Sequence, residues 1–224
     1  MNEMARIRRG KAGRPTRAQA QARHDELLDR ALDHFLDKGY ELATIDAIAA
    51  AVAMTKRTVY AHYADKASLF LAAVSRAITR FAVPPERIAA TRSGNLAQTL
   101  VNIAMLRIAA VADPEGLKLQ RVINTESYRF PAIFSDSYER GTRPTVDFLT
   151  AILREETGLG RLALDEPERA ATVFMSMVVS GPVRFLLSGN PLGDEDLQER
   201  VAFAVRLFLE GSRPRPDGAR GDTG

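Results

Sequence analysis

The sequence predicts an all-α protein, and three observations support this fold class. From Arg17 to about residue 210, apolar side chains recur every three or four positions, the spacing of one face of a helix. Residues that commonly cap helices stand before these stretches, and glycine or proline stands after most of them. No segment alternates convincingly between apolar and polar residues, as a half-buried strand does. The 224 residues are 46% hydrophobic, which is enough to build a core.

The first helix is predicted from an apolar stripe that is surrounded by charged residues. The stripe consists of Leu28, Ala31, Leu32, Phe35 and Leu36. We expect the helix to end at Gly39, because glycine is the residue that most often follows the last helical turn.

Two short helices joined by a tight turn are predicted next. Thr44 and Thr55 are suitable N-caps, and they predict helices over 44–52 and from 55 to about 63. Ala53 and Met54 separate these helices, and neighbouring alanines let them approach closely. Together with the first helix, this pattern is typical of a helix-turn-helix.

The remaining helices follow from caps, periodicity and breaks. Asp65 is expected to cap a helix that runs to about Arg80 and stops before Pro84 and Pro85. Later helices are predicted over 95–112, 114–129, 131–157, 165–188 and 194–210, with start signals at Asn95, Asp113, Asp165 and Asp194. Gly141 with Pro144, and Gly181 with Pro182, predict a kink or a split within two of them.

The charge is distributed unevenly along the chain. The total net charge is +3, but residues 1–23 carry seven basic side chains against Glu3 alone, a net of +6, so residues 24–224 carry −3. A basic arm on a nearly neutral body is typical of contact with a polyanion, although a solubilising leader is an equally good interpretation from composition alone. The arm contains Gly10, Gly13 and Pro15 and almost no large apolar residue, so we expect it to be disordered.

Composition also excludes several classes of site. With no cysteine, the chain has no disulfide, no thiol nucleophile and no cysteine-ligated zinc or iron–sulfur cluster. His24, His34 and His62 are too scattered to suggest a metal site, and no cofactor is expected. No apolar run approaches the ~18 residues of a membrane-spanning helix, and no secretory leader is evident. We therefore expect a soluble cytoplasmic protein with no membrane partner.

The helix predicted from Thr55 carries side chains suited to DNA. Its N-terminal end presents four that can donate to or contact base edges: Lys56, Arg57, Thr58 and Tyr60. DNA phosphate oxygens can be contacted by the side chains of Tyr60, His62 and Lys66. The helix N-termini at Thr44 and Asp65 also favour phosphate. Tyr63, four residues after the inward Val59, is expected to be a core aromatic.

Residues 27–70 match a known family pattern in order, spacing and residue type. The landmarks are Leu28, Ala31, Phe35, Gly39, Tyr40, Thr44, Ile45, Ile48, Ala49, Thr55, Lys56, Thr58, Val59, Tyr60, Tyr63, Lys66 and Leu69. This segment resembles the DNA-binding domain of TetR-family transcriptional regulators. Two positions depart from the family: Ala53 stands where the turn usually has glycine, which costs about 1 kcal/mol if the residue is left-handed, and Arg57 stands where glycine is common.

The resemblance implies a domain organisation and a set of DNA contacts. It implies a three-helix helix-turn-helix DNA-binding domain (24–83) and a helical ligand-binding and dimerisation bundle (84–210). Composition adds the basic arm (1–23) and predicts a disordered tail (211–224), which is rich in glycine, proline, arginine and aspartate. The implied function is a ligand-responsive homodimeric repressor that a small effector releases from a palindromic double-stranded operator. The implied DNA-binding residues are Thr44, Thr55, Lys56, Arg57, Thr58, Tyr60, His62 and Lys66, and we add Arg14, whose Gly13-Arg14-Pro15 setting suggests a minor-groove contact.

The resemblance also implies a partner surface and an effector cavity. The last two helices pair with a second copy, and the interface candidates are Val173, Met177, Phe185, Val201, Phe203, Val205, Phe208 and Leu209. A cavity for a small apolar or aromatic effector is assigned to Met105, Phe130, Phe134, Tyr138, Phe148, Phe174 and Met175, with Arg107, Arg121, Asn124 and Glu126 as polar candidates. The alternative for both sets is that they only close the monomer's own core.

Three other functions are considered. The glycines of Gly158–Ala163 resemble a dinucleotide-binding fingerprint, but no predicted strand precedes them, so we interpret them as a helix stop and loop rather than a sign of an enzyme. A non-specific architectural DNA binder would have a strongly basic body, which this chain lacks. A helical protein whose basic arm binds an anionic membrane is the third alternative.

Overall fold

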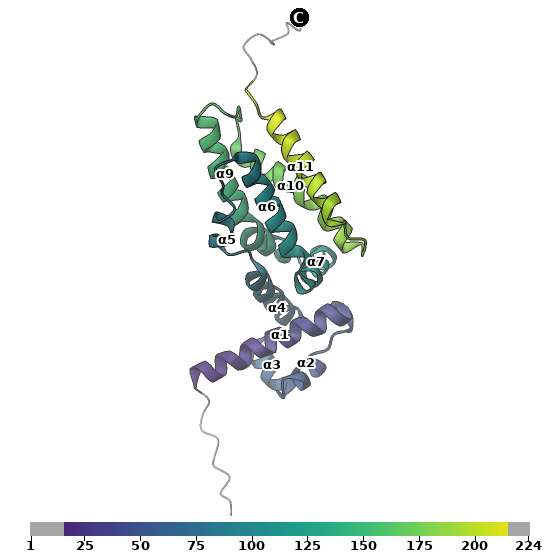
Figure 1. Ribbon diagram of the computed structural model, residues 1–224. Helices are drawn as coiled ribbons and strands as arrows, with labels where there is room; N and C mark the ends of the chain where they lie inside the picture. Colours follow the sequence, from purple (N-terminus) through teal and green to yellow (C-terminus); the bar gives the residue numbers. More distant parts are fainter. Residues whose placement is uncertain (1–15, 215–224) are drawn as a thin grey trace, which may run out of the picture. The chain divides into compact units, whose positions relative to one another are not determined.

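The computed structural model describes residues 16–214, and every regular element among them is a helix. The elements are α1 (Arg17–Leu42), α2 (Ile45–Ala51), α3 (Lys56–His62), α4 (Lys66–Phe81), α5 (Pro85–Ala89), α6 (Leu96–Ala112), α7 (Pro114–Glu126), α8 (Pro131–Asp136), the π-helix η1 (Ser137–Thr142), α9 (Arg143–Gly158), α10 (Pro167–Leu187) and α11 (Asp194–Gly211) (Figure 1). The chain forms two compact units, one up to Ala73 and one from Val74 onwards. The predicted all-α fold is confirmed.

The first unit consists of α1, α2, α3 and the beginning of α4. Its core contains an aromatic cluster in which Phe35 and Tyr40 of α1 meet Phe70 of α4, with ring centroids between 4.9 and 6.1 Å apart. Each of α2 and α3 contributes buried apolar residues to this unit, and Val59 is the buried residue of α3. The two short helices are therefore stabilised by packing, because helices of this length are not stable alone.

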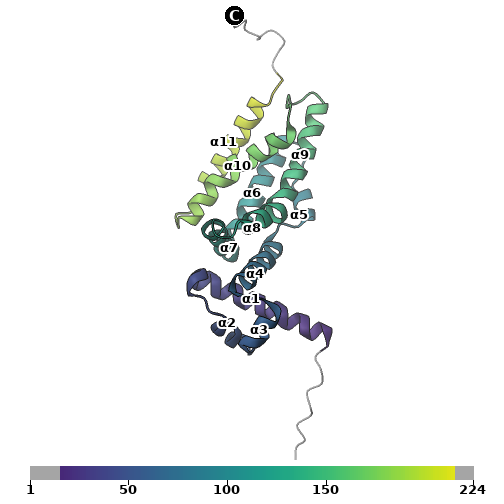
Figure 2. The same ribbon diagram turned by 180° about the vertical axis from the view of Figure 1, so that it is seen from behind.

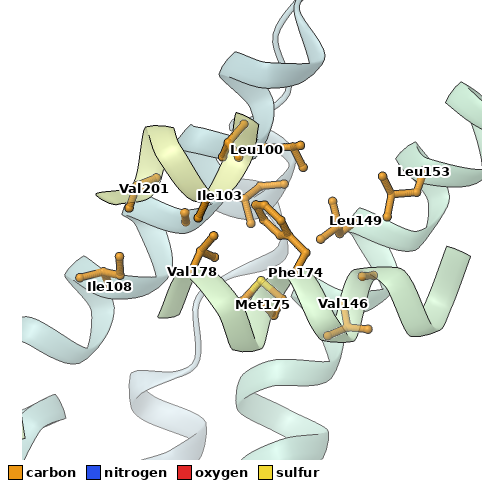
Figure 3. Packing of buried hydrophobic residues seen from close by; sticks show 14 of the residues in the cluster. Leu100, Ile103, Ile108, Val146, Leu149, Leu153, Phe174, Met175, Val178 and Val201 are labelled. Carbon is orange, nitrogen blue, oxygen red and sulfur yellow. The ribbon is translucent and has the colours of Figure 1, made fainter. Parts of the chain in front are cut away.

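The second unit is a helical bundle built around α10. Its buried core is made by α6, α9, α10 and α11, and Figure 3 shows Phe174 of α10 pointing towards Ile103 of α6 and Leu149 of α9. The Phe174 ring also meets the ring of Phe208 edge to face, with centroids 5.0 Å apart. Seen from behind, α7 and α8 lie near one another beneath this bundle (Figure 2).

Most predicted helix starts and stops are confirmed by their capping bonds. The side chains of Thr44, Thr55, Asp65, Asn95 and Asp113 accept hydrogen bonds from backbone N–H groups in the first turn that follows them. In α1 the backbone leaves helical geometry at Gly39 (φ 74°, ψ 166°). These features depend only on neighbouring residues, which explains why the sequence reveals them.

Other boundaries differ from the prediction. The segment expected to be an arm is helical from Arg17, because Thr16 and Gln19 form a capping box there; the arm's remaining residues 1–15 lie outside the described part of the chain. Pro85 begins the short helix α5 instead of only ending its predecessor, since proline fits the first helical turn. Residues 131–157 split into α8, η1 and α9, as Gly141 and Pro144 predict, whereas α10 continues through Pro182.

The turn between α2 and α3 forces an alanine into a left-handed conformation. Ala53 has φ 51°, and among the described residues it is the non-glycine residue with positive φ. The N–H of Met54 donates to the carbonyl of Ala49 (2.9 Å) and the N–H of Ala53 to that of Ala50 (3.2 Å), the pattern of a Schellman cap. That position usually holds glycine, because a Cβ is strained there.

The ammonium group of Lys66 joins the start of α4 to the end of α1. Its Nζ donates to the backbone carbonyls of Tyr40 (2.8 Å), Glu41 (3.1 Å) and Ala43 (3.2 Å). It also lies 4.5 Å from the centre of the Tyr40 ring. The last carbonyls of a helix lack hydrogen-bond donors within the helix. The Lys66 ammonium provides the donors for the carbonyls at the end of α1.

Replacing Ala53 by glycine is predicted to stabilise the protein. The substitution removes the strain of a Cβ at φ 51°, which outweighs the larger backbone entropy of glycine in the unfolded chain, so the free energy of unfolding should rise by about 0.5–1 kcal/mol. Chemical denaturation followed by circular dichroism measures this change. The matched control is Ala50→Gly, at an exposed helical position of α2, which should have the opposite sign. Destabilisation by both variants would contradict the interpretation.

Candidate nucleic-acid interface and candidate ligand cavity

Helix α3 is anchored on one side and exposed on the other. Val59 is fully buried, while Lys56, Arg57, Thr58 and Tyr60 are exposed. Tyr60 exposes 45% of its surface, so it is not a core residue. These four side chains are therefore accessible from solvent, and their contact with DNA stays a prediction.

Lys56 is held by an acidic residue of α2 in the absence of a partner. Its Nζ lies 2.8 Å from Oδ2 of Asp46, and both side chains are exposed. The hydrogen bond and the charge of this carboxylate raise the pKa of Lys56 above its ordinary value. The lysine is thus cationic at neutral pH, but its ammonium is partly occupied.

The threonines at the helix starts serve as caps. The hydroxyl oxygen of Thr44 accepts from the N–H of Ala47 (3.3 Å), and that of Thr55 accepts from the N–H of Thr58 (3.1 Å). The hydroxyl groups of Thr55 and Thr58 are themselves 2.8 Å apart. All three threonines remain exposed, so a lone pair or a hydroxyl proton of each is accessible from solvent.

Lys66 has a different role from the phosphate contact predicted for it. Its ammonium donates to three backbone carbonyls, which accounts for all three of its protons. The side chain therefore stabilises the first unit and is not free to bind a phosphate. The sequence could not distinguish these roles, because the carbonyls lie 23 to 26 residues away.

Two aromatic residues after Val59 contact α1. Tyr63 is half-buried, as expected for an inward residue, and its hydroxyl lies 2.8 Å from Nε2 of His24. The rings of these two residues are stacked, and the exposed His62 meets His24 edge to face at 5.6 Å. Burial, and secondarily the charge of Asp25, raise the pKa of Tyr63. The partner, 39 positions away, gives no signal in the sequence.

Arg14, the remaining predicted DNA-binding residue, lies outside the described residues, as does the Gly13-Arg14-Pro15 triplet. Its contact with the minor groove stays a prediction.

The second unit contains a cavity of about 500 Å³ between α6, α7, η1 and α10. Three residues of the predicted effector set line it: Phe134, Tyr138 and Met175. The polar candidates Arg107 and Asn124 line it as well. This volume is within the range of sites for small organic molecules.

The other predicted cavity residues lie elsewhere. Phe174 is fully buried in the core, and Met105 and Phe148 pack against that core. Arg121 is exposed and does not line the cavity, nor do Glu126 and Phe130. The sequence could not assign these residues to the cavity or the core, because helical spacing shows that one face of a helix is apolar but not which element covers that face.

Sequence reasoning missed a polar wall of the cavity. It is formed by hydroxyl and amide side chains from several helices: Gln120, Ser127, Ser137, Thr142, Thr172, Ser176 and Ser180. These residues share no motif or spacing, because only the packing of α7, η1 and α10 brings them together. The cavity therefore combines apolar and hydrogen-bonding surfaces.

A groove of about 450 Å³ runs along α10 and α11. Among the predicted interface residues, Met177, Phe185, Val201 and Phe203 line it. Val173 and Phe203 are more than half exposed, whereas Val201 and Val205 are buried and Phe208 and Leu209 pack against the core. The alternative that these residues close the monomer's own core therefore holds for Val201, Val205, Phe208 and Leu209, and pairing with a second copy stays a prediction.

The glycine-rich segment Gly158–Ala163 is a helix end. Helix α9 stops at Gly158, and Gly160 has φ 70° in the turn that follows. The interpretation as a stop and loop is confirmed. Between residues 16 and 214, no group of three or more histidine, aspartate or glutamate side chains is arranged to hold a metal ion.

Two segments contradict the expectation that none is apolar enough to cross a membrane. By length and composition alone, Lys66–Ala89 and Pro167–Leu187 would suffice. The physical reason in α10 is that its apolar residues line the core and the groove on different faces. A helix that is apolar on most faces resembles a membrane span in composition.

Comparisons with known proteins agree with this architecture. Residues 27–73 match the family described as "Bacterial regulatory proteins, tetR family", and residues 98–211, about half of the chain, match "AefR-like transcriptional repressor, C-terminal domain". The HTH-type transcriptional repressor AcnR of Corynebacterium diphtheriae is 26% identical over 196 residues, which are 86% of this chain and 94% of that protein. An HTH-type regulator of Mycobacterium tuberculosis is 34% identical over 111 residues, about half of each chain.

Solved structures share the fold over most of the chain. A TetR-family regulator from Mesorhizobium loti superposes with a TM-score of 0.71 at 24% identity, over 89% of this chain and 100% of that one. A protein described as "Flavonoid-responsive Regulator FrrA" superposes with a TM-score of 0.67 at 26% identity, over 88% and 100%. With both of its units matched, the chain belongs to the TetR family of bacterial transcriptional regulators, which are DNA-binding proteins and not enzymes.

Proposed function

We propose that this regulator represses transcription in the cytoplasm by binding a palindromic operator as a homodimer, and that a small effector releases it. The observation that carries the proposal is the exposed N-terminal half of α3, held in place by the buried Val59. A short helix presented in this way fits the major groove, and its arginine, lysine and threonine side chains match base edges.

The DNA contacts proposed for α3 divide by chemistry. Arg57 is exposed, and among the described residues no ion pair holds it, so its guanidinium is available to a guanine or a phosphate. Thr58 and Tyr60 are exposed beside it. Thr44 and Thr55 lie at the N-termini of α2 and α3, where the helix dipole favours a phosphate. Arg14 is proposed to add a minor-groove contact.

Homodimerisation is supported by the apolar groove on α10 and α11. Val173, Phe185, Phe203 and Leu207 are large apolar residues that expose between 39% and 57% of their surface. A monomeric protein rarely leaves such residues clustered along two helices, so a second copy is the proposed cover. Two copies would present two α3 helices to the two halves of a palindrome.

Effector control is supported by the position of η1. Ser137, Tyr138 and Thr142 of this π-helix line the cavity, and Arg140 of the same element donates a hydrogen bond to the hydroxyl of Thr79 in α4 (2.9 Å). α4 begins at Lys66, in the DNA-binding unit. A ligand that favours one arrangement of η1 can therefore shift the DNA-binding population through α4. The description of FrrA as flavonoid-responsive supports an effector with an aromatic body.

Selection from random double-stranded DNA tests the function. The purified full-length chain should enrich a palindromic sequence, because a symmetric dimer reads two equal half-sites. Competition with bulk genomic DNA at physiological salt measures the specificity. Enrichment of no sequence, with equal binding to bulk DNA, would contradict the proposal and favour an architectural DNA binder.

Removing the charge of Asp46 is predicted to strengthen operator binding. Asp46→Asn frees Lys56 and removes a negative charge next to the proposed DNA surface, so the dissociation constant should fall by about threefold or more at low salt. Fluorescence anisotropy over a salt series measures the effect. The matched control is Asp196→Asn, which makes the same charge change in the first turn of α11. Equal effects of the two variants would contradict a specific role for Lys56.

A charge in the groove is predicted to separate the dimer. Leu207→Glu places a carboxylate at a groove position where the leucine is 53% exposed. Burying this carboxylate against a second copy should cost about 2 kcal/mol or more. Sedimentation velocity should therefore show a monomer. Leu159→Glu, at a leucine that is 57% exposed and outside the groove, should remain dimeric. A dimeric Leu207 variant would refute this interface.

A further inference from the structure

A half-buried arginine at the wall of the cavity has a buried side-chain nitrogen with no hydrogen-bond partner among the described residues. Arg107, in the middle of α6, lines the cavity of about 500 Å³, and its Nε is buried without a hydrogen-bond partner among the described residues. Burying a donor of a cation in this way is costly, and proteins rarely leave such a donor unsatisfied unless something else binds it.

Among residues 16–214, no acidic side chain lines the cavity beside Arg107 to compensate its charge. Arg107 is the charged residue among those lining the cavity, and the same holds for the small hollow of about 60 Å³ on its other side. Burial lowers the pKa of Arg107, and no acidic neighbour offsets this. The guanidinium nevertheless stays protonated at neutral pH, because an arginine side chain is a very weak acid.

The other residues that line the cavity indicate what kind of ligand would carry the negative charge that pairs with Arg107. Ile123, Val146, Met175 and Val179 provide apolar surface, and Phe134 and Tyr138 provide aromatic rings. The single positive charge balances one negative charge, so a dianionic phosphate would leave an unpaired charge in the cavity. A carboxylate suits the free Nε–H, because it can accept from Nε and a terminal nitrogen of one guanidinium side by side.

We propose that the effector is a small monocarboxylic acid with an apolar or aromatic body, anchored through its carboxylate on Arg107. This inference rests on the proposed function, whose effector cavity it makes more specific. Arg107 and Gln120 line both the cavity and the small hollow, and Ile78 and Phe81 of α4 line the latter. A carboxylate bound to Arg107 would therefore be separated from the end of α4 only by Arg107 and the small hollow.

Two pairs of probes test the charge requirement. Isothermal titration calorimetry of the full-length protein compares decanoate with decan-1-ol, and 4-phenylbutyrate with 4-phenylbutan-1-ol, each pair matched in its body. At least one acid should bind about tenfold or more tightly than its alcohol, because only the acid pairs with the guanidinium. Acetate, which lacks the apolar body, should not bind at comparable concentration.

Variants of Arg107 assign the preference to this residue. Arg107→Met should reduce the preference for acid over alcohol to within about threefold, and Arg107→Lys should keep part of it. Arg121→Met, at an exposed arginine of α7 outside the cavity, should bind like the wild type. Without ligand, Arg107→Met should unfold at a higher temperature than the wild type, because it removes a desolvated charge.

The outcomes separate this inference from the proposed function. Equal binding of acid and alcohol, a preference that survives in Arg107→Met, or no binding of either acid at millimolar concentration would overturn the carboxylate inference. Release of the operator by a neutral aromatic compound would then leave effector control intact. Conversely, acids that bind through Arg107 but leave operator affinity unchanged would establish a carboxylate site at Arg107 and refute control of DNA binding by this cavity.

Discussion

The first unit depends on the hydrogen bonds from the Lys66 ammonium to the carbonyls of Tyr40, Glu41 and Ala43, which hold the start of α4 against the end of α1. They close the end of α1 just where Gly39 breaks its helical geometry, and they set the start of α4 against it. Tyr40 then packs into the aromatic cluster with Phe35 and Phe70. Helices α2 and α3 lie in the chain between the end of α1 and the start of α4. Their positions, and with them the exposed face of α3, therefore depend on this junction.

Helix α4 belongs to both units of the chain, because it crosses the boundary between Ala73 and Val74. It begins at Lys66 and ends at Phe81, and Thr79 accepts a hydrogen bond from Arg140 of η1. A π-helix has one extra residue per hydrogen-bonded turn and is found frequently at functional sites. Here η1 lines the cavity and its Arg140 contacts Thr79, so the cavity wall is bonded directly to α4.

Helix α10 shows how one amphipathic element serves three surfaces. Ala171, Phe174 and Val178 face the core; Thr172, Met175, Ser176 and Val179 face the cavity; Met177, Gly181 and Phe185 face the groove. Each set follows the spacing of three or four residues, displaced by about one position from the next. The helix is therefore apolar on most of its circumference, which is why it resembles a membrane span and why its residues are hard to assign from the sequence.

The sequence by itself determined features that depend on neighbouring residues: most of the helices, the caps at Thr44 and Thr55 and the break at Gly39. It also indicated which face of α3 is exposed. The tertiary structure decided the rest, including the left-handed conformation of Ala53. Lys66 binds carbonyls rather than phosphate, and Phe174 belongs to the core rather than the cavity. The Nε of Arg107 is buried without a hydrogen-bond partner among the described residues. Helical periodicity shows which side of a helix is apolar or charged, but the partner of that side comes from a segment far away in the chain, and only folding brings the two together.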